Sequence, residues 1–284
     1  MRLCFLSGIS LLLAAGAWAG SRAANGAPVK VFLLAGQSNL AGRAPGEELA
    51  PDAMASAVML DYVCSFGAAT AEPGPPEPHR SGGWGPLQPA PKHASTPGTH
   101  FGPEIGFGRT LAARWPERRI AIIKHGRGAT NLAEDWNPEA TTGRQYYREF
   151  VAQARTVFER LRAEGTPFEL AAFVWCQGNA DSTRREWAEA YDANLRNLLA
   201  RVRKDFDAPT LPVLVVLIGE GRNPRTAFAP AVRAAQRQVT AGDPHTVLVV
   251  ADDLTLLDQA HYDAPSQLEL GRRLAAAFLA RSQP

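Results

Sequence analysis

The sequence contains a serine and an aspartate–histidine pair of the kind that performs nucleophilic catalysis. Ser38 follows an apolar run in Gly36-Gln37-Ser38-Asn39, and Asp258 precedes His261 by three residues. At that spacing the aspartate can accept a hydrogen bond from the imidazole Nδ1–H, which leaves Nε2 as a base. A serine hydroxyl needs such a base within hydrogen-bond reach. The pattern predicts acyl transfer with Ser38 as nucleophile, His261 as base and Asp258 as the orienting acid.

Two glycine-containing loops could supply donors for the oxyanion that acyl transfer generates. Gly126-Arg127-Gly128-Ala129-Thr130 would let backbone N–H groups approach a ligand, and Gln177-Gly178-Asn179 carries side-chain amides. One fixed donor typically contributes about 2.7 to 4 kcal/mol. Taken singly, each loop is also typical of an ordinary turn. A serine at the position of Ser38 is likewise typical of a helix N-cap. The candidates are, as oxyanion donors, Ser38, Gly128 and Gln177 and, as supporting residues, Asn39 and Asn179.

Six short apolar runs precede or carry these motifs and are typical of strands buried on both faces. They cover residues 29–35, 58–63, 119–124, 168–176, 211–218 and 246–251. Apolar residues at three- and four-residue spacing predict helices over 147–161 and 187–206. Ser266 and Glu269 predict a capping box at the start of a last helix.

Strands that alternate with helices imply right-handed crossovers, and therefore an α/β fold with a mainly parallel sheet covered on both faces. Ligands of such sheets bind outside the carboxyl ends of the strands, which is where the motifs fall. Residues 65–103 interrupt the alternation, because nine prolines and seven glycines exclude a continuous helix or a central strand. We interpret 65–103 as a long surface loop near the active face, within one domain over 20–284. A second domain is the less favoured alternative.

The first nineteen residues have the features of a secretory signal peptide. Arg2 is followed by a mostly apolar stretch that is too short to span a membrane, and Ala17-Trp18-Ala19 is a small-x-small cleavage site. We expect residues 1–19 to be removed and the protein to be secreted or periplasmic. An uncleaved anchor is the alternative.

Composition limits the remaining classes of function. The 284 residues are 45% hydrophobic and 20% charged, which suits a globular core of ordinary size. The net charge of +2 gives no electrostatic reason to expect nucleic acid or a membrane surface as a partner. The six histidines lack metal-binding spacing, so we expect no metal and no other cofactor. The oligomeric state stays open.

Five motifs occur in the order seen in the SGNH-hydrolase superfamily, and the sequence most resembles its sialate O-acetylesterase and acetylxylan esterase branch, carbohydrate esterase family 6. The motifs are Gly36-Gln37-Ser38-Asn39, Phe101-Gly102-Pro103-Glu104, Arg127-Gly128-Ala129-Thr130, Trp175-Cys176-Gln177-Gly178 and Asp258-x-x-His261. The resemblance implies a three-layer α/β/α sandwich around a five-stranded parallel sheet. It also implies a metal-independent serine esterase that removes acetyl groups from sugars, with Ser38, His261 and Asp258 as its triad.

The sequence departs from that branch at two positions near the expected site. The family pattern His-Gln-Gly-Glu is Cys176-Gln177-Gly178-Asn179 here, so a glutamate thought to support the histidine is a neutral amide. The second glycine of the family's Gly-Gly-Thr is Ala129. Two alternatives to an acetylated-carbohydrate esterase therefore stay open: a catalytically weak or inactive carbohydrate-binding homologue, and an esterase for non-sugar esters.

The cysteines and tryptophans complete the expectations. In the strand order 2-1-3-4-5 that the resemblance implies, Cys64 and Cys176 lie three strands apart, roughly 14 Å at about 4.8 Å per strand. A disulfide needs Cα atoms within about 7 Å, so we expect two unpaired thiols. The tryptophans, Trp187 among them, are candidate core residues. Trp84 and Trp136 fall in loops and are also candidate stacking surfaces for a sugar.

Overall fold

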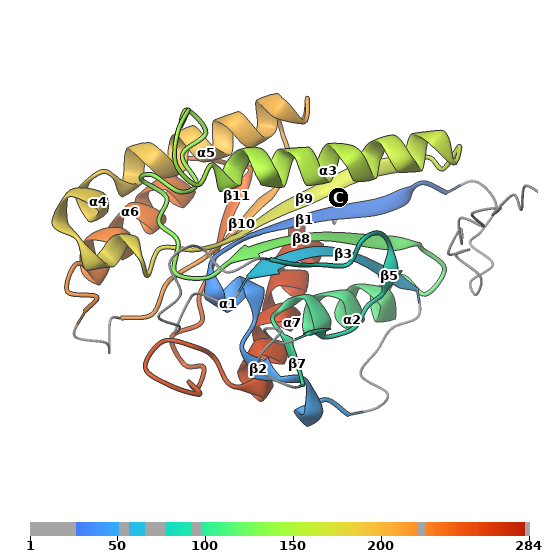
Figure 1. Cartoon of the computed structure of the whole chain (residues 1–284), viewed down its shortest axis with the longest axis horizontal. Coiled ribbons are helices and arrows are strands. Elements are labelled where there is room, and N and C mark those ends of the chain that lie inside the picture. The colour runs from blue at the N-terminus through green and yellow to red at the C-terminus, as the bar shows by residue number, and fades with distance from the viewer. Residues whose placement is uncertain (1–26, 51–56, 66–77, 92–97, 221–224, 282–284) are drawn as a thin grey trace, which may run out of the picture.

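The computed structural model describes residues 27–50, 57–65, 78–91, 98–220 and 225–281. A mainly parallel sheet lies between two layers of helices, as the α/β prediction requires (Figure 1). The predicted signal peptide, residues 1–19, lies outside the described residues. No helix in the described ranges is long and apolar enough to cross a membrane.

The centre of the described sheet consists of six parallel strands in the order β11-β10-β9-β1-β8-β3. Each strand corresponds to one predicted apolar run. The five-stranded sheet that the resemblance implied is one strand smaller than the sheet observed. β1 is paired with β8 on one side and β9 on the other, so its carboxyl end lies at the middle of the sheet edge. The strands are β1 Val29–Gly36, β3 Val58–Ser65, β8 Ile120–Arg127, β9 Phe168–Cys176, β10 Val213–Val216 and β11 Thr246–Val249.

Helices cover both faces of the sheet (Figure 1). One face packs against α1 (Ser38–Ala41), α2 (Glu104–Arg114) and α7 (Ala264–Arg281). The opposite face packs against α3 (Tyr146–Ala163), α4 (Arg185–Glu189), α5 (Tyr191–Asp205) and α6 (Ala229–Ala241). The helix predicted over 147–161 is confirmed as α3. The pattern over 187–206 forms two helices instead of one, because the chain turns at Ala190 between α4 and α5.

The proline-rich segment contributes short strands instead of a continuous loop. In its described parts, β4 (His79–Arg80) and β5 (Gly85–Pro86) pair antiparallel with β3 at the edge of the main sheet. β6 (Ala90–Pro91) and β7 (Thr99–Phe101) form a second small sheet with β2 (Ala44–Pro45), which precedes the one-turn helix η1 (Gly46–Glu48). The prolines therefore limit these strands to two or three residues, as their missing N–H groups require.

The start of α7 differs from the predicted capping box. Asp263 caps the helix, since its Oδ1 accepts the backbone N–H of Ser266 at 2.9 Å. Ser266 lies inside the first turn, and its hydroxyl accepts the backbone N–H of Thr255 at 2.9 Å. The serine therefore holds the incoming loop, and the aspartate before it performs the capping.

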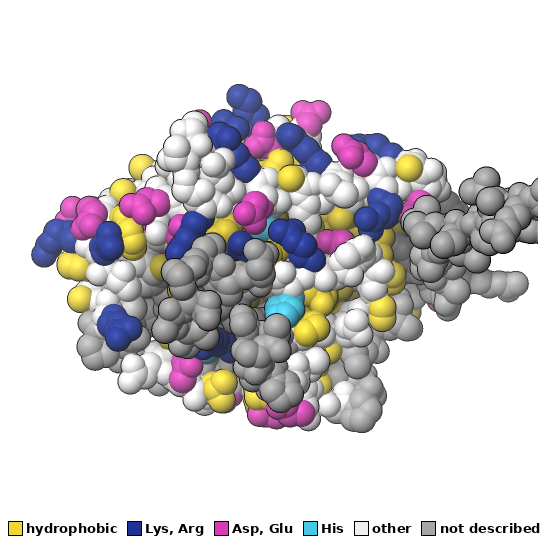
Figure 2. Space-filling model, viewed as in Figure 1, with side chains coloured by type: hydrophobic (Ala, Val, Ile, Leu, Met, Phe, Trp, Pro, Cys, Tyr) yellow, Lys and Arg dark blue, Asp and Glu magenta, His cyan; other side chains and the backbone are white. Residues whose placement is uncertain are grey.

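Both cysteines expected in the mature chain are unpaired and buried, as predicted. Cys64 ends β3 and Cys176 ends β9, and β8 and β1 lie between those strands. The described surface carries charges of both signs. Figure 2 shows acidic and basic side chains interspersed on the face drawn, in keeping with the small net charge.

A buried ion pair anchors the short helix α1 to the sheet. Lys124 on β8 lies 2.7 Å from Glu104 at the start of α2, and each side chain is 1% exposed. Lys124 also donates to the carbonyl of Ala41 in α1 at 2.9 Å. Glu104 accepts the backbone N–H of Gly102 at 3.0 Å. The pair therefore joins β8, α1 and α2 beneath the carboxyl edge of the sheet.

We predict that Lys124→Met lowers the free energy of unfolding by about 3–5 kcal/mol, because it leaves the Glu104 carboxylate buried without its counter-charge. Urea denaturation followed by circular dichroism measures the change. Lys124→Met combined with Glu104→Gln removes both charges and should recover part of the loss. A single variant within about 1 kcal/mol of the wild type would contradict the prediction.

Candidate active site

The chain turns sharply at the end of β1 and presents Ser38 as the first residue of α1. The turn requires glycine at position 36, since a Cβ there would lie 2.1 Å from the carbonyl oxygen of Cys176 in β9. Gln37 braces the turn against the loop after β9. Its Oε1 accepts the backbone N–H groups of Gly178 at 3.1 Å and Ala180 at 3.3 Å.

The structure brings the three residues of the predicted triad into contact. Ser38 Oγ lies 3.0 Å from Nε2 of His261, although 223 positions separate them in the sequence. The other ring nitrogen, Nδ1, lies 2.7 Å from Oδ2 of Asp258. This geometry leaves Nε2 to accept the hydroxyl proton and places the charge of the carboxylate behind the ring.

Asp258 is held as an anion by the turn in which it lies. Besides the imidazole, its Oδ1 accepts the backbone N–H groups of Ala260 at 2.8 Å and His261 at 2.9 Å. Partial burial alone would raise the pKa of Asp258, but the hydrogen bonds from His261 and the two amides outweigh it and lower that pKa. An ionised carboxylate on Nδ1 fixes the tautomer in which Nε2 is the base.

Asn39 connects the turn after β1, which contains Ser38, to the segment between β11 and α7, which contains His261 and is called the histidine loop. Its Nδ2 donates to the carbonyl of Ala260 at 3.0 Å, and its Oδ1 accepts the backbone N–H of Tyr262 at 3.3 Å. These two residues flank His261. The backbone carbonyl of Asn39 also accepts Nε2 of Gln267 in α7 at 3.1 Å. Asn39, a candidate supporting residue, therefore fixes the backbone on both sides of the imidazole.

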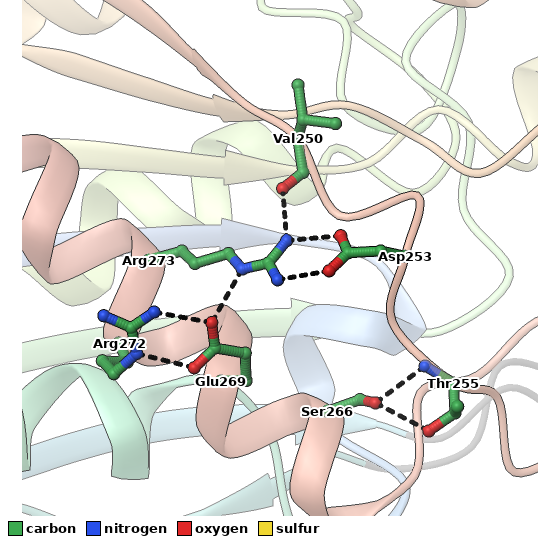
Figure 3. A network of polar contacts seen from close by, with 7 residues as sticks. All are labelled: Val250, Asp253, Thr255, Ser266, Glu269, Arg272 and Arg273. Atoms are coloured by element: carbon green, nitrogen blue, oxygen red, sulfur yellow. Dashed lines mark hydrogen bonds and ion pairs between the residues drawn. The ribbon is translucent and has the colours of Figure 1, made fainter.

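Figure 3 shows how the segment between β11 and α7 is fastened to the helix. Arg273 of α7 makes two 2.6 Å contacts with the carboxylate of Asp253 and donates to the carbonyl of Val250 at 3.1 Å. The Arg273 guanidinium lowers the pKa of Asp253 to about 2, so the pair stays charged at neutral pH. Thr255 is held to Ser266 by its backbone N–H and by its hydroxyl, 3.1 Å away. The first part of the histidine loop, which leads to His261, is thus fixed to α7.

Two of the three expected oxyanion donors are already engaged within the protein. The backbone N–H of Gly128 donates to the carbonyl of Ser65 at 2.8 Å, which continues the pairing of β8 with β3. The Gln177 amide donates to the carbonyl of Thr130 at 3.0 Å and to Asp181 Oδ2 at 2.5 Å. Both of its hydrogens are used, so in this structure neither Gly128 nor Gln177 can donate to a substrate.

Other backbone donors at the site are open. The N–H groups of Ser38 and Ala129 make no hydrogen bond to any described residue. Ala129 lies in the loop after β8 with φ of 56°, in the left-handed region that favours glycine. The family's second glycine, which Ala129 replaces, thus falls at a position whose backbone suits it. Ala129 is exposed, and it lines the cleft.

Asp181 binds the loop after β8, in which Ala129 lies, through its buried carboxylate. It lies in the one-turn helix η3 (Asp181–Thr183), its side chain is fully buried, and its carboxylate accepts the backbone N–H groups of Leu132 at 2.9 Å and Ala133 at 3.2 Å. Gln177 supplies a further hydrogen bond. Desolvation raises the pKa of Asp181 to about 6, although these hydrogen bonds oppose the shift. Sequence reasoning did not single out Asp181 for this role, since nothing in its spacing reveals the loop that it binds.

Asn179 makes no hydrogen bond to Ser38, His261 or Asp258. Its side chain lines the cleft and makes no hydrogen bond to any described residue, whereas His261 is already held by Asp258. The cleft has a volume of about 630 Å³. Its lining includes residues on both sides of Ser38 and His261, namely Gln37, Asn39, Ala260 and Tyr262. This volume is within the range typical of small-molecule sites.

No group of three or more His, Cys, Asp or Glu side chains in the described ranges could hold a metal ion. His125 is fully buried and lies 2.9 Å from Gln153, and burial lowers its pKa to about 3. It is a packed histidine away from the cleft.

Comparison with known proteins decides the family. The sequence model described as "carbohydrate esterase, sialic acid-specific acetylesterase" matches residues 28–280. The chain belongs to this family. The resemblance inferred from the five motifs is therefore confirmed, and the chain is a member of a family of carboxylic ester hydrolases.

Relatives of this carbohydrate esterase family member share its fold. A "probable carbohydrate esterase" of Arabidopsis thaliana is 33% identical over 112 residues, which cover 39% of this chain and 41% of that protein. A solved Arabidopsis thaliana structure has a TM-score of 0.67 at 23% identity, covering 89% of this chain and 99% of that one. The structure of NanS has a TM-score of 0.63 at 16% identity, covering 89% of this chain and 97% of that one. The structure of a carbohydrate acetylesterase from Xanthomonas citri has a TM-score of 0.56 at 18% identity, covering 87% of this chain and 55% of that one.

We predict that Asn39→Ala lowers kcat on an aryl acetate by about 10- to 100-fold, because the backbone on both sides of His261 loses its anchor and the ring leaves its productive position. KM should change little. Asn39→Asp keeps the oxygen that accepts the Tyr262 N–H and should lose less. Steady-state kinetics on variants with unchanged thermal unfolding test this, and a kcat for Asn39→Ala within twofold of the wild type would contradict it.

A second prediction concerns the pH dependence of stability. The pKa of Asp181 is raised above its unfolded value, so its contribution favours the folded state below about pH 4 and is lost as the pH rises to about 6. The difference corresponds to about 3 kcal/mol. In Asp181→Asn this fall should disappear. Urea denaturation of both proteins between pH 4 and 7 measures the two slopes, and parallel slopes would refute the assignment.

Proposed function

We propose that this protein is a serine esterase that removes O-acetyl groups from carbohydrates through an acyl-Ser38 intermediate. The observation that carries the proposal is the chain of contacts from Ser38 Oγ through His261 to Asp258, at 3.0 Å and 2.7 Å. Membership of the carbohydrate esterase family supports the ester and sugar parts of the proposal. A carbohydrate carrying an acetyl ester is then the substrate.

The geometry supports a two-step reaction. As the Ser38 oxygen attacks the acetyl carbonyl, His261 Nε2 takes the hydroxyl proton, and Asp258 stabilises the imidazolium that forms. The tetrahedral intermediate then releases the sugar, whose oxygen receives the proton from His261. In the second step His261 takes a proton from water, the resulting hydroxide attacks the acyl-enzyme, and acetate leaves while Ser38 regains its proton.

The oxyanion of each tetrahedral intermediate needs donors at the carboxyl edge of β1 and β8. We assign this role to the open backbone N–H groups of Ser38 and Ala129, in place of Gly128 and Gln177, whose hydrogens are engaged elsewhere. Gln177 is a positioning residue instead. It fixes the carbonyl of Thr130 and the carboxylate of Asp181, and so the loop that contains Ala129.

The alternative of an inactive carbohydrate-binding homologue rested on the neutral Asn179. The structure offers another acid for the histidine, since Asp258 binds Nδ1 with both carboxylate oxygens. The orienting role is thus filled without residue 179, which favours an active enzyme. An N-terminal signal peptide over 1–19 remains our proposal for export to a secreted or periplasmic location.

We predict that Ser38→Ala lowers kcat for acetate release by about 10⁴-fold or more, because the nucleophile is lost. The substrates are an acetylated xylo-oligosaccharide and 4-nitrophenyl acetate, with acetate or nitrophenol measured. Ser81→Ala, a serine on the edge of the sheet outside the cleft lining, is the matched control and should leave kcat unchanged.

Two results would count against this function. Activity that survives Ser38→Ala refutes the nucleophile assignment, and glycan binding without turnover by the wild type favours the inactive homologue. Comparison of acetyl, butyryl and octanoyl esters on one aryl leaving group separates an acetylesterase from an esterase for longer, non-sugar esters. The acetyl ester should be hydrolysed fastest.

A further inference from the structure

The cleft beside the triad continues along the carboxyl edge of the sheet. Its described lining extends from Gln37 at the end of β1, past Val216 at the end of β10, to Ala251 after β11. β1 and β11 lie three strands apart, roughly 14 Å at about 4.8 Å per strand. A groove of that length exceeds the span of the single sugar ring that would carry the reacting acetyl group.

Trp187 of α4 provides an aromatic surface in this groove. Within the described lining, the aromatic residues are Trp187 and Tyr262. Tyr262 is 5% exposed, whereas Trp187 is only partly buried. The candidates taken from the sequence, Trp84 and Trp136, do not line the cleft, and Trp136 is fully buried with its Nε1 bonded to Thr130. The prediction that Trp136 is a core residue is therefore confirmed, and the alternative that it stacks on a sugar is wrong.

The indole of Trp187 is held in place before any ligand arrives. The guanidinium of Arg184 lies 4.2 Å from the ring centroid, and Arg184 itself does not line the cleft. The neighbouring Ala188 is buried in the core and donates its backbone N–H to the Arg184 carbonyl at 3.1 Å. The ring is thus supported from one side and accessible from another, which reduces the entropy lost on binding.

The position of Trp187 relative to the triad suits a second sugar ring. α4 follows β9, the strand next to β1, and three lining residues, Asn179, Ala180 and Thr183, lie in the segment between the end of β9 and Trp187. A pyranose ring has an apolar C–H face, and a partly exposed indole has an apolar surface that gains from covering. The polar groups between the two positions can meet the sugar hydroxyls.

We propose that Trp187 is the platform of a binding subsite for a sugar ring beyond the one that carries the scissile acetyl group. The substrate is then an acetylated oligosaccharide or polysaccharide, and not a single acetylated sugar. This inference rests on the proposed function, because the acetyl group must react at Ser38 for the subsite to lie next to it. The stacking surface can be tested without turnover.

The kinetic test compares Trp187→Ala with the wild type on three esters: 4-nitrophenyl acetate, an acetylated xylose and an acetylated xylotetraose. We expect kcat/KM for the tetraose to fall about tenfold, mainly through KM, because one aromatic stacking contact is lost. Values for the two smaller esters should stay within about twofold. Trp187→Phe keeps an aromatic ring, so its kcat/KM for the tetraose should lie between the values of the wild type and of Trp187→Ala. Trp84→Phe makes the same change at a partly buried tryptophan outside the cleft lining. It should leave kcat/KM for all three esters unchanged.

A binding test separates this proposal from the proposed function. In Ser38→Ala, isothermal titration calorimetry with unacetylated xylo-, manno- and chito-tetraose should show binding of at least one. Adding Trp187→Ala should raise that Kd about tenfold. If the wild type releases acetate from no ester but this change in Kd appears, the esterase function fails and the subsite stands.

Three outcomes overturn the subsite. The first is an equal loss of kcat/KM on all three esters, which would indicate a role in the reaction or in folding. The second is an unchanged tetraose kcat/KM together with an unchanged Kd. The third is a failure of all three oligosaccharides to bind Ser38→Ala.

Discussion

The arrangement of the site depends on the two hydrogen bonds that Asn39 makes across the sheet edge. They join the turn after the first strand to a loop that arrives more than two hundred positions later, and they do so at the residues that flank His261. Because the backbone on either side of His261 is anchored, Asp258 has only the ring of that residue left to orient. The Ser38 contact is then a consequence of a rigid loop that is fastened by α7 at its base (Figure 3).

Two polar side chains that follow β9, Gln177 and Asp181, serve to build the site. Gln177 and Asp181 lie directly after a central strand, and both are buried. A buried amide or carboxylate must satisfy its hydrogen-bonding groups, and the nearest partners are the backbone groups of the loop after β8. The loop, which includes Ala129, is thereby fixed beside the cleft. Burial thus makes Gln177 and Asp181 supports for this loop.

For physical reasons, the sequence was sufficient to predict the strands and the contacts among Ser38, His261 and Asp258. Apolar runs must be buried, and parallel strands place their carboxyl ends at one edge, so Ser38 and His261 had to lie near each other. It did not reveal that Ala190 divides a continuous apolar pattern into α4 and α5, since both helices use the same spacing. It also could not show that the Gln177 and Gly128 donors are engaged, because their acceptors, Thr130 and Ser65, become neighbours only through the tertiary fold.

The two thiols have a consequence for the conditions in which the protein can exist. Cys64 and Cys176 are unpaired, and burial raises the pKa of the Cys176 thiol to about 12, so hardly any thiolate forms at neutral pH. Only the thiolate reacts readily with oxidants and alkylating agents. No cross-link between these two residues is needed to reach the native fold. The folded protein should therefore tolerate dithiothreitol, which has no bridge between Cys64 and Cys176 to reduce, and its Cys176 thiol should react slowly with iodoacetamide.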